Sequence, residues 1–294
     1  MSSGDPATDL REAFTQDFIA RERTDCVFFV LPRNLFLACR SRGPPDARTL
    51  KAGYGKSALS DPRKNHLLAA VSGLEWRRLA PHLESVDLPL GKVLYEAGGS
   101  LDYVYFPVSG IISLLYVMAD GSSAEIAVVG NEGIVGFALF MGGRTTPSCA
   151  IVQGAGAGFR LPARIVEEEF NRSGPVMHLL LRYTQALITQ MAQTAACNRH
   201  HSLDQQLCRW LLLSLDRLDT SELAMTQELI ANMLGVRREG VTEAALKLQR
   251  MGLIRYARGH VWVLDRPALE KRCCECYAVV KREYDRLLPD KIAP

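Results

Sequence analysis

The chain has 294 residues, 48% of them hydrophobic, which is long enough and apolar enough for two domains with real cores. This composition excludes the disordered and fibrous classes of protein. The net charge of +3 is unevenly spread, because the segment 236–266 carries seven basic and three acidic residues. Such a segment suits a polyanionic partner, although a charged run is more often a solvated face.

No stretch of the sequence approaches the length of a membrane span, and the apolar run from Cys26 to Leu31 ends at Pro32. We therefore expect a cytoplasmic protein without a membrane partner. Eight cysteines without regular spacing in a chain of this length do not indicate a disulfide framework.

Residues 1–63 form the first segment, and their apolar periodicity is poor. Glycine and proline interrupt them repeatedly, although a short helix around 9–22 fits the pattern. We interpret this segment as an extension that is either disordered or translated from a start codon set too far upstream.

A β-rich sensory domain is expected at 64–174. After two short apolar helical faces, runs rich in β-branched and aromatic residues occur at 92–95, 103–106, 111–118, 124–129, 149–153 and 158–161. Turn signals separate these runs. Many short strands at this spacing predict a sandwich, a barrel or a roll.

A long helix is expected at 175–201, since no glycine or further proline occurs between Pro175 and Asn198. A narrow stripe recurs along it at spacings of four and three, formed by Leu180, Thr184, Leu187, Met191 and Thr194. Such a stripe is typical of a two-stranded coiled coil, so we interpret it as the seam of a homodimer. The alternative is an amphipathic helix that packs on its own domain.

The most informative pattern lies at 226–253, within an expected DNA-binding domain at 202–276. Thr226 can cap a helix that ends at Gly235, where a turn needs a positive φ. A second helix is expected from Arg237 to Met251. Its exposed beginning could reach base edges in a major groove, whereas an ordinary helical hairpin would not need a basic exposed start.

Two short apolar strands follow at 253–256 and 261–264 and predict a hairpin, or wing, whose basic residues touch phosphates. A terminal segment, 277–294, remains as a C-terminal tail. The residues expected to contact DNA are Thr226, Gln227, Arg237, Arg238, Glu239, Thr242, Glu243, Lys247, Arg258 and His260.

Over roughly residues 66–276 the sequence resembles the Crp/Fnr family of bacterial transcription regulators. The resemblance rests on VLYEAGGSLDYVYFPVSGIISLL, DGSSAEIAVVGNEGIVG and TQELIANMLGVRREGVTEAALKLQRMGLI. It implies an α+β protein with a β-roll like that of cyclic-nucleotide-binding domains, a long dimerisation helix and a C-terminal winged helix-turn-helix. It also implies a non-enzymatic homodimer on palindromic double-stranded DNA, controlled by a small effector, with RNA polymerase as a partner if it activates transcription.

The competing interpretation is an effector-binding module without DNA activity. Such a module would keep the nucleotide pocket and lack the winged helix, whereas this sequence shows the reverse. In the recognition helix, Arg238 and Glu239 match the family pattern. Glu243 stands where a second arginine is expected and Gly240 replaces the usual serine or threonine. We therefore expect this helix to dock in the major groove as in the rest of the family, but on a half-site with a different base sequence.

The effector pocket implied by the resemblance departs further from the family pattern. Neither the carboxylate that holds the ribose nor the guanidinium that holds the phosphate is present, and Arg144, three residues before Pro147, is a candidate substitute for the guanidinium. We therefore expect no response to cyclic AMP, and instead another effector, a redox input through Cys149, or none. The residues at the pocket positions are Gly136, Phe137, Ala138, Pro147, Ser148 and Cys149.

Cysteines cluster at 273–276, and His200 and His201 adjoin each other, but neither group shows enough ligands for a metal ion by itself. The two cysteines of the extension, Cys26 and Cys39, are too sparse for an iron–sulfur cluster. We expect incidental thiols, no metal and no cofactor.

Overall fold

The computed structural model describes residues 61–218 and 220–288. The expectation for the extension therefore lies outside the described residues, except at its end. There Asp61 caps the short 3-10 helix η2 (Pro62–Lys64) by accepting a hydrogen bond from the Arg63 amide at 2.9 Å. In the described part of the chain, no helix is both long enough and apolar enough to cross a membrane.

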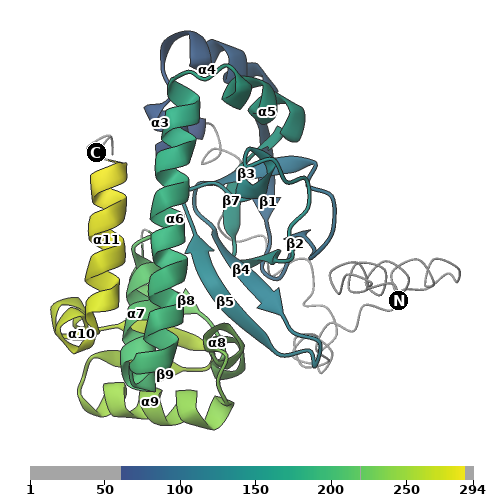
Figure 1. Ribbon diagram of the computed structural model, residues 1–294. Helices are drawn as coiled ribbons and strands as arrows, with labels where there is room; N and C mark the ends of the chain where they lie inside the picture. Colours follow the sequence, from purple (N-terminus) through teal and green to yellow (C-terminus); the bar gives the residue numbers. More distant parts are fainter. Residues whose placement is uncertain (1–60, 219, 289–294) are drawn as a thin grey trace, which may run out of the picture. The chain divides into compact units, whose positions relative to one another are not determined.

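Two antiparallel sheets form a roll (Figure 1). One has the order β1-β7-β3 and the other β2-β6-β4-β5. Ile111, Leu114 and Leu161 are fully buried in its core. The strands are β1 (Glu84–Leu88), β2 (Val93–Tyr95), β3 (Tyr103–Pro107), β4 (Ile111–Val117), β5 (Ser123–Val129), β6 (Cys149–Gly154) and β7 (Gly156–Pro162).

Short helices flank the roll. Asn65 caps the first of them, and its buried amide donates to the carbonyl oxygens of Pro107 and Gly133 at 2.9 and 2.8 Å. Arg78 and Glu169 form a two-pronged ion pair between α4 and α5. The helices are α3 (His66–Ala70), α4 (Gly73–Leu79), η3 (Ala80–His82), η4 (Phe137–Leu139) and α5 (Ala163–Asn171).

The long helix α6 (Pro175–His200) runs along the roll and continues, after a break at His201, into the C-terminal elements. Its side chains bind the roll directly, since the Tyr183 hydroxyl donates to the Ile134 carbonyl at 3.0 Å and the Gln190 amide donates to the Val128 carbonyl at 3.0 Å. The last helix, α11 (Glu275–Leu287), lies beside α6 (Figure 1). Most of the segment expected as a C-terminal tail therefore belongs to a packed helix.

The remaining elements form a winged helix-turn-helix, as the sequence predicts. Its small sheet has the order β8-β10-β9, and α7 packs against α9. The elements are α7 (Leu203–Leu215), β8 (Glu222–Ala224), α8 (Gln227–Leu234), α9 (Arg238–Arg250), β9 (Ile254–Ala257), β10 (His260–Val263) and α10 (Arg266–Arg272).

Candidate nucleic-acid interface

The turn between α8 and α9 has the geometry that its sequence demands. Gly235 adopts φ 66°, a left-handed conformation that costs glycine little. The Thr226 hydroxyl caps α8 by accepting from the Leu229 amide at 3.2 Å. Ala231 and Val241 are 3% and 0% exposed, so the two helices meet through small and branched side chains.

The first turns of α9 present a polar surface to solvent. Arg237, Arg238, Glu239 and Glu243 are all exposed. The Thr242 hydroxyl lies 2.7 Å from the Gln227 side-chain oxygen and 3.0 Å from the Arg238 carbonyl, so it also ties α9 to the start of α8. This surface combines donors and acceptors at a helix end, which is the arrangement that reads base edges in a major groove.

Two of the basic side chains expected at DNA have a carboxylate partner within the protein. The Lys247 ammonium forms an ion pair with Asp204 of α7 at 3.1 Å, and the lysine side chain is half exposed. The His260 ring nitrogen Nδ1 lies 2.6 Å from a carboxylate oxygen of Glu222 on β8. Both contacts thus help to hold the domain together, and the charge of Lys247 is partly neutralised.

Arg258 occupies the tip of the wing between β9 and β10. It is exposed and has φ 51°, while the following Gly259 has φ 79°. The Gly259 carbonyl accepts from the Met225 amide at 2.7 Å, which anchors the wing to the segment before α8. Arg258 therefore stands at the end of a fixed hairpin, where a phosphate contact is feasible.

Gly240, which departs from the family pattern, lies where α9 approaches α7. A Cβ atom at this position would come 2.8 Å from a terminal methyl of Leu203. A side chain here would have to displace that methyl, so the glycine fits the close packing of the two helices.

The stripe expected at the dimer seam is buried within a single protomer. Leu180, Thr184, Leu187 and Thr194 are 4%, 4%, 0% and 7% exposed within a single protomer, and Met191 is half-buried. The stripe packs on its own roll and C-terminal elements, which is the alternative that the sequence left open. The reason is that a 4–3 spacing identifies an apolar stripe but not the surface that buries it.

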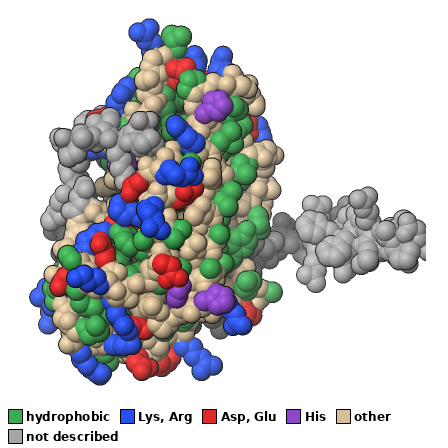
Figure 2. Space-filling model, turned by 60° about the vertical axis from the view of Figure 1, so that its left-hand side comes forward, with side chains coloured by type: hydrophobic (Ala, Val, Ile, Leu, Met, Phe, Trp, Pro, Cys, Tyr) green, Lys and Arg blue, Asp and Glu red, His purple; other side chains and the backbone are tan. Residues whose placement is uncertain are grey.

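A second stripe lies one position further along α6 and faces solvent. Leu181 and Ile188 are 45% and 55% exposed, and Gln185, Ala192 and Ala195 are exposed between and beyond them. These residues also recur at spacings of four and three. Figure 2 shows hydrophobic side chains gathered in a column on this side of the molecule.

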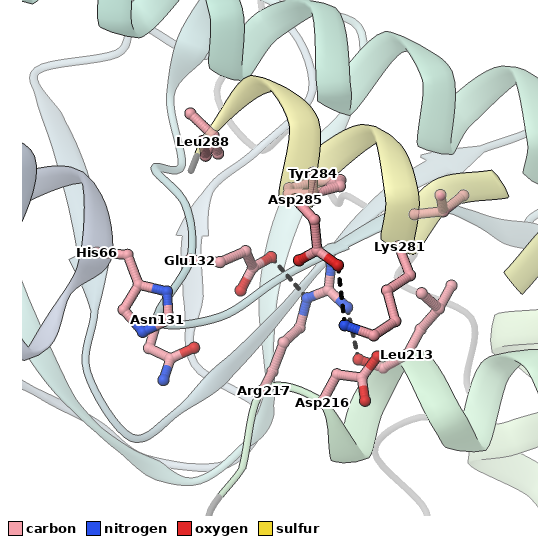
Figure 3. Close-up of a pocket in the computed structure, with 11 residues that line it drawn as sticks. His66, Asn131, Glu132, Leu213, Asp216, Arg217, Lys281, Tyr284, Asp285 and Leu288 are labelled. Atoms are coloured by element: carbon pink, nitrogen blue, oxygen red, sulfur yellow. Dashed lines mark hydrogen bonds and ion pairs between the residues drawn. The ribbon is translucent and has the colours of Figure 1, made fainter. Parts of the chain in front are cut away.

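A buried arginine joins the roll to the DNA-binding elements (Figure 3). Arg217, just after α7, pairs with Glu132 of the roll at 2.6 Å and donates to the Gln190 side chain of α6 at 2.9 Å. Its guanidinium lies 5.7 Å from the Tyr284 ring of α11. A cavity of about 140 Å³ beside it, partly lined by Lys281, has room for a few water molecules.

This joint explains two glycines of the segment 130–136. A Cβ atom at Gly130 would come 2.5 Å from the Cβ of Arg217, and one at Gly133 would come 2.6 Å from the Tyr183 hydroxyl. Neither contact is compatible with a side chain. The glycines therefore serve the close approach of the roll to its neighbours.

A second contact between the roll and α7 involves a buried carboxyl group. Glu125 of β5 accepts hydrogen bonds from the Ser113 hydroxyl at 2.6 Å and from the Trp210 indole of α7 at 3.1 Å. Burial raises the pKa of Glu125 to about 7, although these hydrogen bonds and the nearby Arg209 oppose the shift. No sequence pattern singles out this glutamate.

The six residues at the expected effector positions lie in two places. Gly136 has φ 101° and its Cα faces β3, where a Cβ atom would come 3.2 Å from the Tyr103 carbonyl oxygen. Phe137 and Ala138 are half-buried in η4, whereas Pro147 is exposed at the approach to β6. The cavity beside Arg217 is not lined by any of the six.

The structure supports neither Arg144 as a phosphate partner nor Cys149 as a redox sensor. Arg144 pairs with Glu167 of α5 at 2.8 Å, so its charge is already engaged. Ser148 and Cys149 are 2% and 8% exposed. Burial also raises the pKa of the Cys149 thiol, which disfavours the thiolate that redox chemistry needs.

Four residues that are distant in sequence converge at the end of α6: Cys197, His201, Cys274 and Cys276. The expectation that these cysteines and histidines lack further ligand partners is wrong, because α6 supplies two of the four. The i, i+4 spacing of Cys197 and His201 on a helix is the signal that could have revealed the pair.

Comparisons with known families cover both halves of the described chain. Residues 85–173 match the family described as the cyclic nucleotide-binding domain, and residues 205–272 match the Crp-like helix-turn-helix domain. No curated protein matches the sequence significantly.

Solved structures share the fold at low sequence identity. FixK2 from Bradyrhizobium japonicum is 16% identical, with a TM-score of 0.56 over 65% of this chain and 98% of that chain. A CRP-family transcriptional regulator from Thermus thermophilus is 21% identical, with a TM-score of 0.54 over 64% and 95%. CLP, a c-di-GMP-responsive regulator from Xanthomonas campestris, is 16% identical, with a TM-score of 0.51 over 64% and 97%.

Proposed function

The chain belongs to the Crp/Fnr family of DNA-binding transcription regulators, and on that premise we propose that it acts as a homodimer on a palindromic DNA site. The observation that carries the proposal is the exposed start of α9, with Arg237, Arg238 and Glu239 free to approach DNA. As a regulator of transcription it works where the DNA is, in the cytoplasm.

The proposed dimer contact is the exposed stripe of α6, centred on Leu181 and Ile188. Two large apolar side chains exposed on one helix face are costly in water, and a second copy of the same face would bury them. A two-fold dimer then presents two copies of α9, which suits a site of two inverted half-sites.

Within each half-site, Arg238 is the proposed reader of a guanine, with Glu239, Thr242 and Glu243 beside it on the same surface of α9. Arg258 on the wing is proposed to bind a phosphate. Lys247 and His260 are secondary, because each would have to leave a carboxylate partner first.

The roll is proposed to sense a signal other than cyclic AMP. The positions that would face the ribose and the phosphate hold Phe137 and Pro147, neither of which offers a side-chain hydrogen bond. A signal in the roll could reach α7 through Arg217 and Glu125, which both link the two parts. If the protein activates transcription, RNA polymerase is its further partner.

Selection from a library of duplexes with a randomised core tests the proposal. The full-length protein should enrich an inverted repeat. Enrichment of no sequence, at salt concentrations that suppress non-specific binding, would contradict sequence-specific DNA binding, and enrichment of an asymmetric sequence would contradict the two-fold arrangement.

A further inference from the structure

Side chains with metal-binding atoms meet where the end of α6 reaches the start of α11. Cys197 lies in the last turn of α6 and His201 is its C-cap, while Cys274 is the N-cap of α11 and Cys276 lies in its first turn. The four donor atoms all lie within 4.8 Å of one another. The three cysteines are 0%, 5% and 2% exposed, so the group is shielded from solvent.

Two distances within the group match the edges of a tetrahedron around a single ion. With zinc–sulfur bonds of about 2.3 Å and zinc–nitrogen bonds of about 2.0 Å, neighbouring sulfurs lie about 3.8 Å apart and a sulfur lies about 3.5 Å from a nitrogen. Here the Cys197 and Cys274 sulfurs are 3.6 Å apart, and the Cys276 sulfur lies 3.5 Å from Nδ1 of His201.

The chemistry of the donors selects the class of metal. Three sulfurs and one imidazole nitrogen form the Cys₃His set of closed structural zinc sites, and hard ions such as Mg²⁺ and Ca²⁺ prefer oxygen. An iron–sulfur cluster needs its own irons and sulfides between the cysteines, and these donors lie too close together to enclose one.

A neighbouring carboxylate orients the histidine for this role. Nε2 of His201 lies 3.4 Å from a carboxylate oxygen of Glu275, on the side of the ring away from Cys276. A proton on Nε2 is favoured by that carboxylate, which leaves the lone pair on Nδ1 facing the sulfurs. Metal-binding histidines commonly have such a partner.

The surroundings also suit a negatively charged site. Three thiolates, a neutral histidine and Zn²⁺ carry a net charge of −1. The positive N-terminal end of α11, a helix of 13 residues, faces Cys274 and Cys276. Arg209 of α7 is 3% exposed, its charge acts on Cys197, and its Nε has no hydrogen-bond partner among the described residues.

We propose that Cys197, His201, Cys274 and Cys276 bind one zinc ion, which fixes α11 to the end of α6. The site adjoins the break between α6 and α7, so the ion also sets how the long helix meets the DNA-binding elements. It is independent of the DNA-reading surface and can be tested without DNA.

The test measures metal in the purified full-length protein kept reduced. We expect one zinc per chain by mass spectrometry, and, after exchange, Co²⁺ should give the visible bands of a tetrahedral thiolate site. Cys276→Ser and His201→Ala should each weaken binding more than about 100-fold, and Glu275→Gln about tenfold. The matched controls, Cys273→Ser and His200→Ala, should keep the ion.

Three results would overturn the proposal: zinc-free protein that gives no tetrahedral Co²⁺ spectrum, a disulfide between Cys197 and Cys274 in the reduced preparation, or equal loss of metal in Cys273→Ser and Cys276→Ser. His201→Cys is the control for misfolding. It keeps four ligands, so it should keep the ion and raise the charge-transfer absorption in the ratio of four thiolates to three. Loss of the ion from a folded His201→Cys protein would contradict the site.

Discussion

At the scale of single residues, Arg238 and Arg258 have the same charge but different settings. Arg238 lies at the exposed start of α9, which we propose reads base edges, while Arg258 lies at the tip of a hairpin. A guanidinium that binds guanine carries sequence information, whereas one that binds phosphate does not. The two arginines should therefore differ in what their loss does.

Arg238→Ala should reduce discrimination against a substituted base pair by about 1–3 kcal/mol. That is roughly 5- to 150-fold in affinity ratio, measured by fluorescence anisotropy on the enriched duplex and its single-pair variants. Arg258→Ala should weaken binding to all duplexes alike and reduce the slope of log affinity against log salt by about 1. Equal losses from both variants on every duplex would show that Arg238 does not read a base.

Glu125 should make the free energy of unfolding depend on pH. Its pKa of about 7 in the folded protein lies above the ordinary value of 4.5, so between these two values the folded chain holds a proton that the unfolded chain has lost. Stability should therefore fall as pH rises from about 4.5 through 7, by an amount on the order of 3 kcal/mol.

Glu125→Gln keeps an acceptor for Trp210 without the ionisation, so it should remove that part of the slope in denaturant unfolding. Glu96→Gln, at an exposed glutamate, is the control and should leave the slope unchanged. A wild-type slope that survives in Glu125→Gln would assign the pH dependence to other groups.

At the scale of elements, the local patterns were the most informative. The strands β3, β4 and β5 and the helices α8 and α9 lie within a few residues of their expected ranges, because alternation, caps and Gly235 act locally. Strand β1 was missed, since its sequence Glu84–Leu88 is mostly exposed and polar and depends on pairing with β7. Which side of α6 is buried cannot be predicted from the pattern of that helix alone, because it depends on the elements that pack against it.

The exposed stripe of α6 yields a prediction about assembly. The wild-type protein should sediment at about twice the 32.5 kDa chain mass. Ile188→Glu places a charge in the proposed contact and should weaken the dimer more than about tenfold, because burying an unpaired charge is costly.

Leu74→Glu is the matched control, since Leu74 is 63% exposed on α4 and is not part of the α6 stripe. It should leave the mass unchanged. A dimer that survives Ile188→Glu would show that this stripe is not the contact.

At the scale of the whole molecule, the roll matches the cyclic nucleotide-binding domain family, yet the positions that the family resemblance assigns to the pocket lack the charged partners of a nucleotide. Each lost charge-assisted hydrogen bond costs about 1.5–3 kcal/mol. Losing two weakens affinity by about two to four orders of magnitude.

Isothermal titration with millimolar cyclic AMP should show no binding, and DNA affinity should not change. Micromolar binding that tightens DNA affinity would refute this expectation.

The complete Cys₃His group and the Arg217 joint could not be predicted from the sequence for a shared physical reason, although the spacing of Cys197 and His201 indicates one pair of ligands. Each assembles from segments that are far apart in the chain, as Cys197 and Cys274 are, and each becomes visible only when α11 packs beside α6. The structure therefore reveals which buried polar groups meet, whereas the sequence alone does not.

The central claim is that a two-fold dimer reads two inverted half-sites on one face of the duplex. The most direct measurement is the affinity of the full-length protein for the enriched repeat as its half-site spacing is changed. Adding about five base pairs between the half-sites, which is half a helical turn, should reduce the affinity to that of a single half-site. Adding about ten should restore much of the lost affinity. Affinity that is indifferent to spacing, or a single half-site bound as tightly as the repeat, would contradict the claim.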